Sequence, residues 1–360
     1  MNRLVRIGSA AAVLAFAAGI ANLKADQAVT LAVTMTNDSV ANEIKIYDAG
    51  SRALVQTLPA QGKGGVGGNA RGVKQYRGEI VAVVNNGSNT VALYRRDGSG
   101  LRFDKLVTTT SAPVTVDFAN EHMYVAGATT VDSFVIRGNS VERLDGTASL
   151  ELAAGGAPPS GSTAQVGAID SRRLLVTLKT DPDPGTVDIV PLADGAITGA
   201  APIAVSAPAG TLTPFGFSVY PDGTAVITLA HSSQVGLFRD GTFTSVIDAT
   251  QAADCWSTRD GKYVFTANTG SKTISRLIGT GNNVFVDDSV AAAIATGGAP
   301  ADIDSDQGVL GVIDHGGGHS HLSLFTYNAF GELTPGGAPI DVGVANANGV
   351  AILAPADRNE

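Results

Sequence analysis

Three histidines and one aspartate fall close together near the C-terminal end of the sequence, in the segment 314–321. The candidate ligands are Asp314, His315, His319 and His321. Imidazole nitrogens and carboxylate oxygens suit Zn, Cu or Ni, and three ligands with an open position suit a catalytic ion. The glycines between them leave the backbone free to bring the rings together. The spacing therefore predicts a divalent metal site, and the alternative interpretation is an exposed polar turn.

His231 and Arg71 are two further side chains with the chemistry to act on a ligand. His231 follows the apolar run 226–230, so we expect it at the end of a strand. Histidine is the side chain type that most often transfers protons near neutral pH, which suits proton transfer or ligand contact. Arg71 stands in the glycine-rich segment 67–72, where a guanidinium would bind an anion. The alternatives are an ordinary solvated residue for His231 and a surface ion pair for Arg71.

The elements that would position these residues recur along the chain. Each copy contains an apolar strand, a polar turn, a second apolar strand, a small or polar turn and a third, alternating strand. The copies cover 80–94, 216–238 and 256–275, and in weaker form 31–47, 122–134, 174–190 and 309–325. They are spaced by about 46 residues, which lies in the range of propeller blades.

These seven copies predict an all-β fold, a seven-bladed β-propeller of four-stranded antiparallel blades. The alternative is a β-sandwich or two smaller β-domains, but regular spacing without a linker disfavours it. After the last copy, the apolar segment 349–354 looks like the first strand of a blade, and the N-terminal copy lacks such a strand. We therefore expect 349–354 to complete the blade begun by 31–58 and to close the ring.

In such a propeller, the turns between second and third strands and the connections between blades share one rim. This rim would gather the segments 85–89, 179–185, 231–233, 268–272 and 314–321. The segments that enter the inner strands would line the channel there, at 68–72, 213–216 and 254–256. Polar groups that converge on a concave mouth are the usual form of a binding site. We therefore expect a ligand site at the channel mouth.

The composition excludes several classes of function. Of the 360 residues, 44% are hydrophobic and 16% charged, which is ample for one large core. The net charge is −9 without a basic cluster, so neither a nucleic acid nor a membrane surface is expected as a partner. Cys255 is the single cysteine, which excludes an intrachain disulfide. We expect a monomer whose partner is a small molecule or a protein ligand at the channel mouth.

The N-terminus has the pattern of a secretory signal. Arg3 and Arg6 precede the apolar run 10–18, which is shorter than the roughly 20 residues that a bilayer span needs. Small residues follow, and cleavage is expected after Ala21 or Ala25; an uncleaved anchor is the alternative. The sequence thus predicts a signal peptide over 1–25 and one propeller domain over 26–360. It also predicts export to the periplasm or the medium, with no membrane span after cleavage.

Three segments, 220–223, 260–268 and 85–91, look like YVTN-type repeats. Over essentially residues 30–355 the chain resembles the lactonase-like propeller family, which includes 6-phosphogluconolactonase and the 3-carboxymuconate-lactonising enzyme. The segments 213–217 and 254–256 look closer to an exported bacterial branch of that family. The resemblance implies a seven-bladed propeller and suggests a lactone as substrate.

The resemblance also implies a catalytic histidine near the start of an inner strand, paired with an arginine and a glutamate. The position that matches this histidine holds Gln165, and the glutamate position holds Leu178 or Leu229. An amide and an alkyl side chain cannot accept a proton as a general base does. An alignment shifted by one residue would instead offer His231 as the substitute. The candidate catalytic residues are therefore His231, Arg71 and Gln165, and the acid–base pair of the family is missing.

These observations favour an exported binding or recognition propeller that has lost the lactonase pair. The alternative is a hydrolase that acts on a lactone or small ester, with assistance from a metal at the His315 segment. A third interpretation is an envelope protein that uses the propeller only as a scaffold. The sequence thus leaves open whether the protein is an enzyme.

Overall fold

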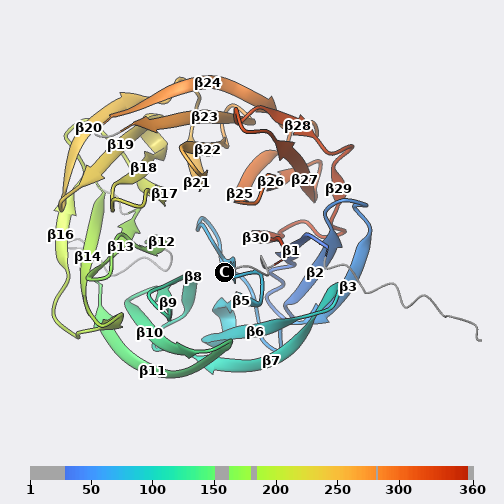
Figure 1. The fold of residues 1–360 in the computed structure, drawn as a ribbon, viewed down its shortest axis with the longest axis horizontal. Coiled ribbons are helices and arrows are strands. Elements are labelled where there is room, and N and C mark those ends of the chain that lie inside the picture. The colour runs from blue at the N-terminus through green and yellow to red at the C-terminus, as the bar shows by residue number, and fades with distance from the viewer. Residues whose placement is uncertain (1–28, 151–161, 180–184, 281–282, 356–360) are drawn as a thin grey trace, which may run out of the picture.

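The computed structural model describes residues 29–150, 162–179, 185–280 and 283–355. Within them, seven antiparallel sheets stand radially around one axis (Figure 1), which confirms the predicted seven-bladed β-propeller. None of the helices in the described ranges has the length and apolar character of a membrane span. The expected signal peptide at 1–25 lies outside the described residues.

The blades follow one another along the chain, except that blade one takes its innermost strand from the C-terminus. Blade one contains β1 (Leu31–Met35), β2 (Glu43–Asp48), β3 (Leu54–Pro59) and β30 (Asn348–Leu353). Blade two contains β4 (Val73–Tyr76), β5 (Ile80–Asn85), η1 (Asn86–Ser88), β6 (Thr90–Asp97) and β7 (Gly100–Thr108). Blade three contains β8 (Pro113–Ala119), β9 (His122–Gly127), β10 (Thr130–Arg137) and β11 (Ser140–Ser149).

The remaining blades repeat this order from the axis outwards. Blade four contains β12 (Thr163–Ala168), β13 (Arg173–Leu178), β14 (Thr186–Ala193), β15 (Ala196–Ile197) and β16 (Ile203–Ser206). Blade five contains β17 (Pro214–Val219), β18 (Ala225–Leu229), η2 (Ala230–Ser232), β19 (Gln234–Arg239) and β20 (Thr242–Asp248). Blade six contains β21 (Asp254–Asp260), β22 (Tyr263–Asn268), β23 (Thr273–Thr280) and β24 (Asn283–Ala293). Blade seven contains β25 (Ala299–Asp306), β26 (Val309–Gly316), β27 (His319–Tyr327), β28 (Leu333–Pro335) and β29 (Ile340–Asp341).

In blades four and seven the outermost position is shared by two short strands. The strands β15 and β16 both pair with β14, and β28 and β29 both pair with β27. The predicted plan of four antiparallel positions therefore holds in every blade.

Burial falls from the second strand of a blade to its outer edge. Every residue of β5, β9 and β22 is buried, because both faces of a second strand are covered by neighbouring blades. The outer strand β3 alternates exposed and half-buried residues instead. The apolar runs recognised in the sequence are thus the strands whose burial holds adjacent blades together.

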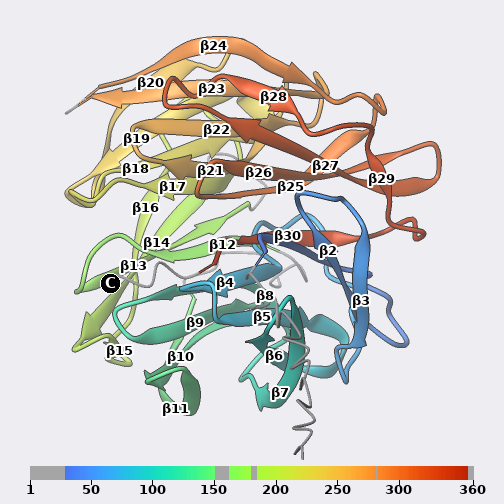
Figure 2. The same cartoon turned by 45° about the vertical axis from the view of Figure 1, so that its right-hand side comes forward.

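The ring is closed by the two ends of the chain, as predicted. The C-terminal strand β30 pairs antiparallel with β1, with Leu31 opposite Leu353 and Val33 opposite Ala351. Strand β25 of blade seven packs against β30, as can be followed in Figure 2. Two carboxylates of β25, those of Asp304 and Asp306, accept backbone N–H groups of β30 and of the residue just after it.

Asp304 is the central group of this closure. Its Oδ2 accepts the N–H of Ile352 at 3.0 Å, and its Oδ1 lies 2.7 Å from Nζ of Lys74 on β4. Asp306 similarly accepts the N–H of Ala354 at 2.9 Å. Because Asp304 is 3% exposed, its charge depends on these partners. One buried carboxylate thereby joins blades seven, one and two.

Replacing Asp304 by alanine is expected to lower the free energy of unfolding by about 3 kcal/mol, since Lys74 and the Ile352 N–H lose their partner. Denaturant unfolding at neutral pH measures this loss. The control is Asp240→Asn, which removes the charge of an 86% exposed carboxylate 3.8 Å from Arg239, suits the positive φ of 49° at this position and should leave the midpoint unchanged. If the two variants unfold at the same denaturant concentration, Asp304 does not have this role.

Candidate functional site

The connection between β3 and β4 enters the central channel and crosses it (Figure 1). We call its residues 67–71 the plug. Its backbone and side chains bond to blades three to seven: the plug partners are Val114, Val116, Asp117, Ala164, Lys179, Phe217, Trp256 and Asp302. The channel mouth is therefore occupied by the protein's own chain.

Hydrogen bonds in both directions between the plug and the blades hold the plug in place. The indole N–H of Trp256 donates to the Asn69 carbonyl at 2.8 Å, and the Asn69 amide donates to Val114 O at 2.7 Å. The Lys179 ammonium donates to the Gly68 carbonyl and lies 5.6 Å from the centre of the Phe215 ring. Burial lowers the pKa of Lys179 to about 8.

Asn37 fixes the glycine-rich stretch that leads into the plug. Its Oδ1 accepts the N–H groups of Gly65 and Val66 at 2.8 and 3.0 Å, and its Nδ2 donates to Val66 O at 2.7 Å. A Cβ at Gly64 would lie 2.5 Å from the Asn37 carbonyl carbon, so only glycine fits there. The stretch 64–68 is thus glycine-rich because the backbone passes against blade one, and it is not a phosphate-binding loop.

Two of the three predicted catalytic residues, Arg71 of the plug and Gln165 of β12, bind the same backbone carbonyl. Arg71 has φ of 58°, donates its backbone N–H to Asp302 and places Nη1 3.2 Å from Asp117 Oδ1. Gln165 is fully buried and binds the backbone of Phe217 twice, accepting from its N–H at 3.0 Å and donating to its carbonyl at 2.7 Å. Arg71 Nη2 donates to the same Phe217 carbonyl at 3.3 Å. Their polar groups are thus engaged in joining inner strands to the plug.

His231 lies apart from these two residues. It belongs to η2 at the end of β18 and is exposed, as the apolar run before it indicated. Its Nδ1 lies 2.7 Å from the hydroxyl oxygen of Thr213, within the same blade. The structure therefore does not bring His231 together with Arg71 and Gln165.

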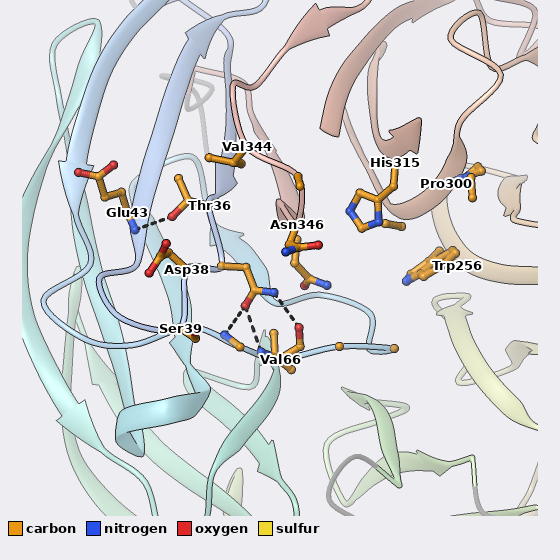
Figure 3. Close-up of a pocket in the computed structure, with 18 of the residues that line it drawn as sticks. Thr36, Asp38, Ser39, Glu43, Val66, Trp256, Pro300, His315, Val344 and Asn346 are labelled. Atoms are coloured by element: carbon orange, nitrogen blue, oxygen red, sulfur yellow. Dashed lines mark hydrogen bonds between the residues drawn. The ribbon is translucent and has the colours of Figure 1, made fainter. Parts of the chain in front are cut away.

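A pocket of about 650 Å³ opens on the same rim, between blades one and seven and against the plug (Figure 3). Its lining residues are Thr36–Ser39, Ala41, Glu43, Gly65–Gly68, Trp256, Thr269, Ala299–Ala301, His315, Val344–Asn346 and Asn348. Its walls are formed by the turn between β1 and β2, the plug connection, the start of β25 and the segment before β30. Trp256 of β21 and Thr269 after β22 add a wall from blade six. Trp256, Gly68 and His315 belong to segments that were expected to line the mouth.

The pocket has two chemically different ends (Figure 3). Asp38, Ser39 and Glu43 lie at one end, and Trp256, Pro300 and His315 lie at the other. Backbone N–H groups of Ala41 and Val40 bind the Asp38 carboxylate and lower its pKa, so it is ionised at neutral pH. At the opposite end Trp256 packs edge-on against Phe215, with ring centroids 5.4 Å apart.

His315 has a tautomer that its surroundings determine. Its Nε2 lies 2.8 Å from the Ala347 carbonyl oxygen, which can only accept a hydrogen bond. Nε2 therefore carries the hydrogen, and in the neutral ring Nδ1 keeps its lone pair. His315 is exposed and lines the pocket, so this site includes one side chain able to take a proton.

Of the four predicted metal ligands, the structure brings Asp314 and His321 together. His321 Nδ1 lies 3.5 Å from the buried Asp314, whereas His315 binds the Ala347 carbonyl and His319 Nδ1 lies 3.2 Å from Asp341. The register explains this arrangement: Asp314 lies opposite His321 on neighbouring strands, and the adjacent His315 points to the other face of the sheet. Within the described ranges, no group of three or more His, Cys, Asp or Glu is placed to hold a metal ion.

Several pocket residues were not singled out in the sequence. Asp38 and Ser39 stand in a polar turn between apolar strands, and Asn346 precedes the closing strand. Such residues are typical of any turn, so their types alone do not distinguish them. They become recognisable only when ring closure places the two ends of the chain side by side.

The sequence matches no protein-family model and no curated protein. Solved structures do share its fold. A protein from Lactobacillus plantarum has a TM-score of 0.63 at 17% identity, with 91% of this chain and 100% of that chain covered. A putative 6-phosphogluconolactonase from Bacteroides fragilis has a TM-score of 0.61 at 13% identity, covering 90% and 98%. The periplasmic gluconolactonase of Pseudomonas aeruginosa has a TM-score of 0.60 at 15% identity, covering 90% and 99%. The expected likeness to lactonase-like propellers is therefore confirmed for the fold.

Asp302, which anchors the plug, is expected to make stability depend on pH. Burial raises its pKa to about 7, so ionisation favours the unfolded chain and its contribution to stability falls as the pH rises from 3.8 to about 7. Relative to the wild type, Asp302→Asn should gain about 2 kcal/mol of unfolding free energy between pH 5 and pH 7. Denaturant unfolding at both pH values measures this gain. Asp240→Asn is the exposed control, and its difference in unfolding free energy from the wild type should be the same at both pH values. If the difference for Asp302→Asn is also the same at both pH values, the raised pKa is contradicted.

Proposed function

We propose that this protein binds a small polar ligand in the pocket between blades one and seven. The observation that carries the proposal is a cavity of about 650 Å³ with polar side chains along its length and an indole at one end. Cavities of roughly 300–1,000 Å³ with few, well-placed polar groups are typical of small-molecule sites. A ligand of monosaccharide to disaccharide size fits this description.

The pocket offers hydrogen-bonding groups that the protein leaves unused. Within the described residues the Asn346 side chain has no hydrogen-bonding partner, and it lies between the two ends of the pocket (Figure 3). His315 contributes a free Nδ1 at the other end, as derived above. The walls are preformed, because Asn37 and Trp256 bind the plug connection by side-chain hydrogen bonds. Preformed walls reduce the entropy lost on binding.

We also propose that the protein acts outside the cytoplasm. The charged start, the short apolar run at 10–18 and the small residues after it support this proposal. One protein of the same fold is described as a periplasmic gluconolactonase. The intact mass of the chain recovered from cells tests it: loss of the first 21 or 25 residues is expected, and retention of Met1 to Ala25 in the recovered chain would exclude cleavage.

Saturable binding of a sugar or sugar lactone is the expected result, measured by titration calorimetry with D-glucose, D-glucosamine and glucono-δ-lactone. Asn346→Ala should weaken binding about tenfold, because one hydrogen bond to a buried ligand is worth about 1.4 kcal/mol. Ala345→Trp should abolish it by filling the pocket from an exposed position. Asn283→Ala, on the outer strand β24, is the matched control. Binding that is equally strong in Ala345→Trp would place the site elsewhere.

A second candidate function is the hydrolysis of a lactone, which the fixed tautomer of His315 favours. Nδ1 would take a proton from water as the water oxygen bonds to the lactone carbonyl carbon. The resulting tetrahedral species would expel the ring oxygen, and the imidazolium would return the proton to that oxygen. The product is a hydroxy acid, and no step requires a metal ion.

If the protein is a hydrolase, His315→Gln should lower kcat on glucono-δ-lactone at least 100-fold, because general base catalysis is typically worth 10²–10⁴-fold. A pH-indicator assay of acid release measures the rate, with Asn283→Ala as the control. Activity that survives His315→Gln but disappears with chelator would instead assign the chemistry to a metal. If the protein binds the lactone but does not turn it over, the hydrolase function is excluded and the binding function stands.

A further inference from the structure

All charged side chains among the described lining residues carry one sign. Asp38 and Glu43 are the acidic residues of this described lining, which contains neither lysine nor arginine. His315, at the far end, is the described lining side chain that gains a positive charge on protonation. The charge that the described lining contributes at neutral pH is therefore negative and lies at one end.

The two carboxylates remain available to a ligand. Asp38 uses Oδ1 to accept the N–H groups of Val40 and Ala41, at 2.7 and 2.9 Å, and Oδ2 has no partner within the described residues. Glu43 donates its backbone N–H to Thr36 Oγ1 at 3.0 Å, while its carboxylate has no partner in the described part of the chain. Both lie at the same end of the pocket (Figure 3).

Among the described residues, no lysine or arginine forms an ion pair with Asp38 or Glu43. Lys179 donates to the Gly68 carbonyl, and Lys45 donates to Val342 O at 2.6 Å. Arg71 of the plug is paired with Asp117 of β8. The exposed Lys63 is not among the described lining residues.

The opposite end offers one edge of an aromatic ring. Trp256 is 7% exposed, and that edge borders the pocket beside Pro300. Its indole N–H is already bound to Asn69, so the ring contributes contact area and no donor. A ligand ring that packs here would extend its substituents past Asn346 towards Asp38 and Glu43.

We infer that the pocket selects ligands that carry a positive charge, such as an amino sugar or another cyclic amine, over neutral and anionic ones. An ammonium group at the acidic end forms charge-assisted hydrogen bonds with Asp38 and Glu43, and a phosphate or carboxylate is repelled there. This inference rests on the proposed binding function and adds the charge of the ligand to it. A preference for cations also distinguishes this pocket from a site that binds phosphorylated sugars.

The test compares three sugars that share a pyranose ring and differ in charge. Their binding to the purified protein is measured by titration calorimetry at pH 6.5. These probes are D-glucosamine, N-acetyl-D-glucosamine and D-glucose 6-phosphate. Glucosamine is expected to bind at least tenfold more tightly than its N-acetyl derivative in low salt, with a smaller ratio in 0.5 M NaCl. Equal or tighter binding of the phosphate ester overturns the inference.

Asp38→Asn and Glu43→Gln, combined, should remove the preference, so that the affinities for glucosamine and N-acetyl-D-glucosamine differ by a factor of about one. The fold tolerates Asp38→Asn, because an amide oxygen still accepts the N–H groups of Val40 and Ala41. Lys63→Gln is the matched control, and it should change none of the affinities. A preference that persists in the double variant overturns the inference.

The outcomes also separate this inference from the proposed function. Binding that Ala345→Trp abolishes, but that shows no preference for the amine, overturns only the choice of a cationic ligand. Absence of binding by all three probes overturns both.

Discussion

The pairing of β30 with β1 is the contact on which the rest of the molecule depends. It joins residues more than 300 positions apart, such as Thr34 Oγ1 and Gly349 O, and it completes a ring in which each inner strand packs on the next. An open ring would expose two inner edges and the apolar faces beside them. The pocket lies on this seam, since its walls come from blade one, blade seven and the segment before β30. A site of this kind forms only after the chain ends have met.

The plug is the second determinant of the site, and it explains why the cavity lies to one side of the axis. A glycine-rich connection passes close to Asn37, where a side chain would collide, and then crosses the channel. Its backbone groups find partners on the blades opposite, which satisfies polar groups that burial would otherwise leave unpaired. The plug thereby occupies the channel mouth, a common location for ligands in a propeller, and the pocket lies beside it at the seam.

Repetition made the fold predictable, whereas the site depends on contacts that do not repeat. Apolar alternation, Asp-Gly turns and the orphan strand at 349–354 indicated both the blades and their closure, because each reflects a local rule of strand burial. Arg71 and Gln165 were expected to act on a ligand, but their partner is the backbone of Phe217 in another blade, which no residue type reveals. The histidine segment was expected to converge, yet the strand register places His321 beside Asp314 and turns His315 to the other face, where it lines the pocket.

Shared architecture and site chemistry are therefore separate properties in this protein. Identities of 13–17% with the compared propellers suffice for the blades, because many apolar side chains satisfy the same buried strand. The pocket is built from turns and connections, where burial constrains residue type much less and charge can change freely. If the proposed binding function holds, what enters it is decided by Asp38, Glu43, His315 and Trp256, since neither lysine nor arginine is among the described lining residues. For a fold that hosts many functions, those few side chains are the physical basis for naming a ligand.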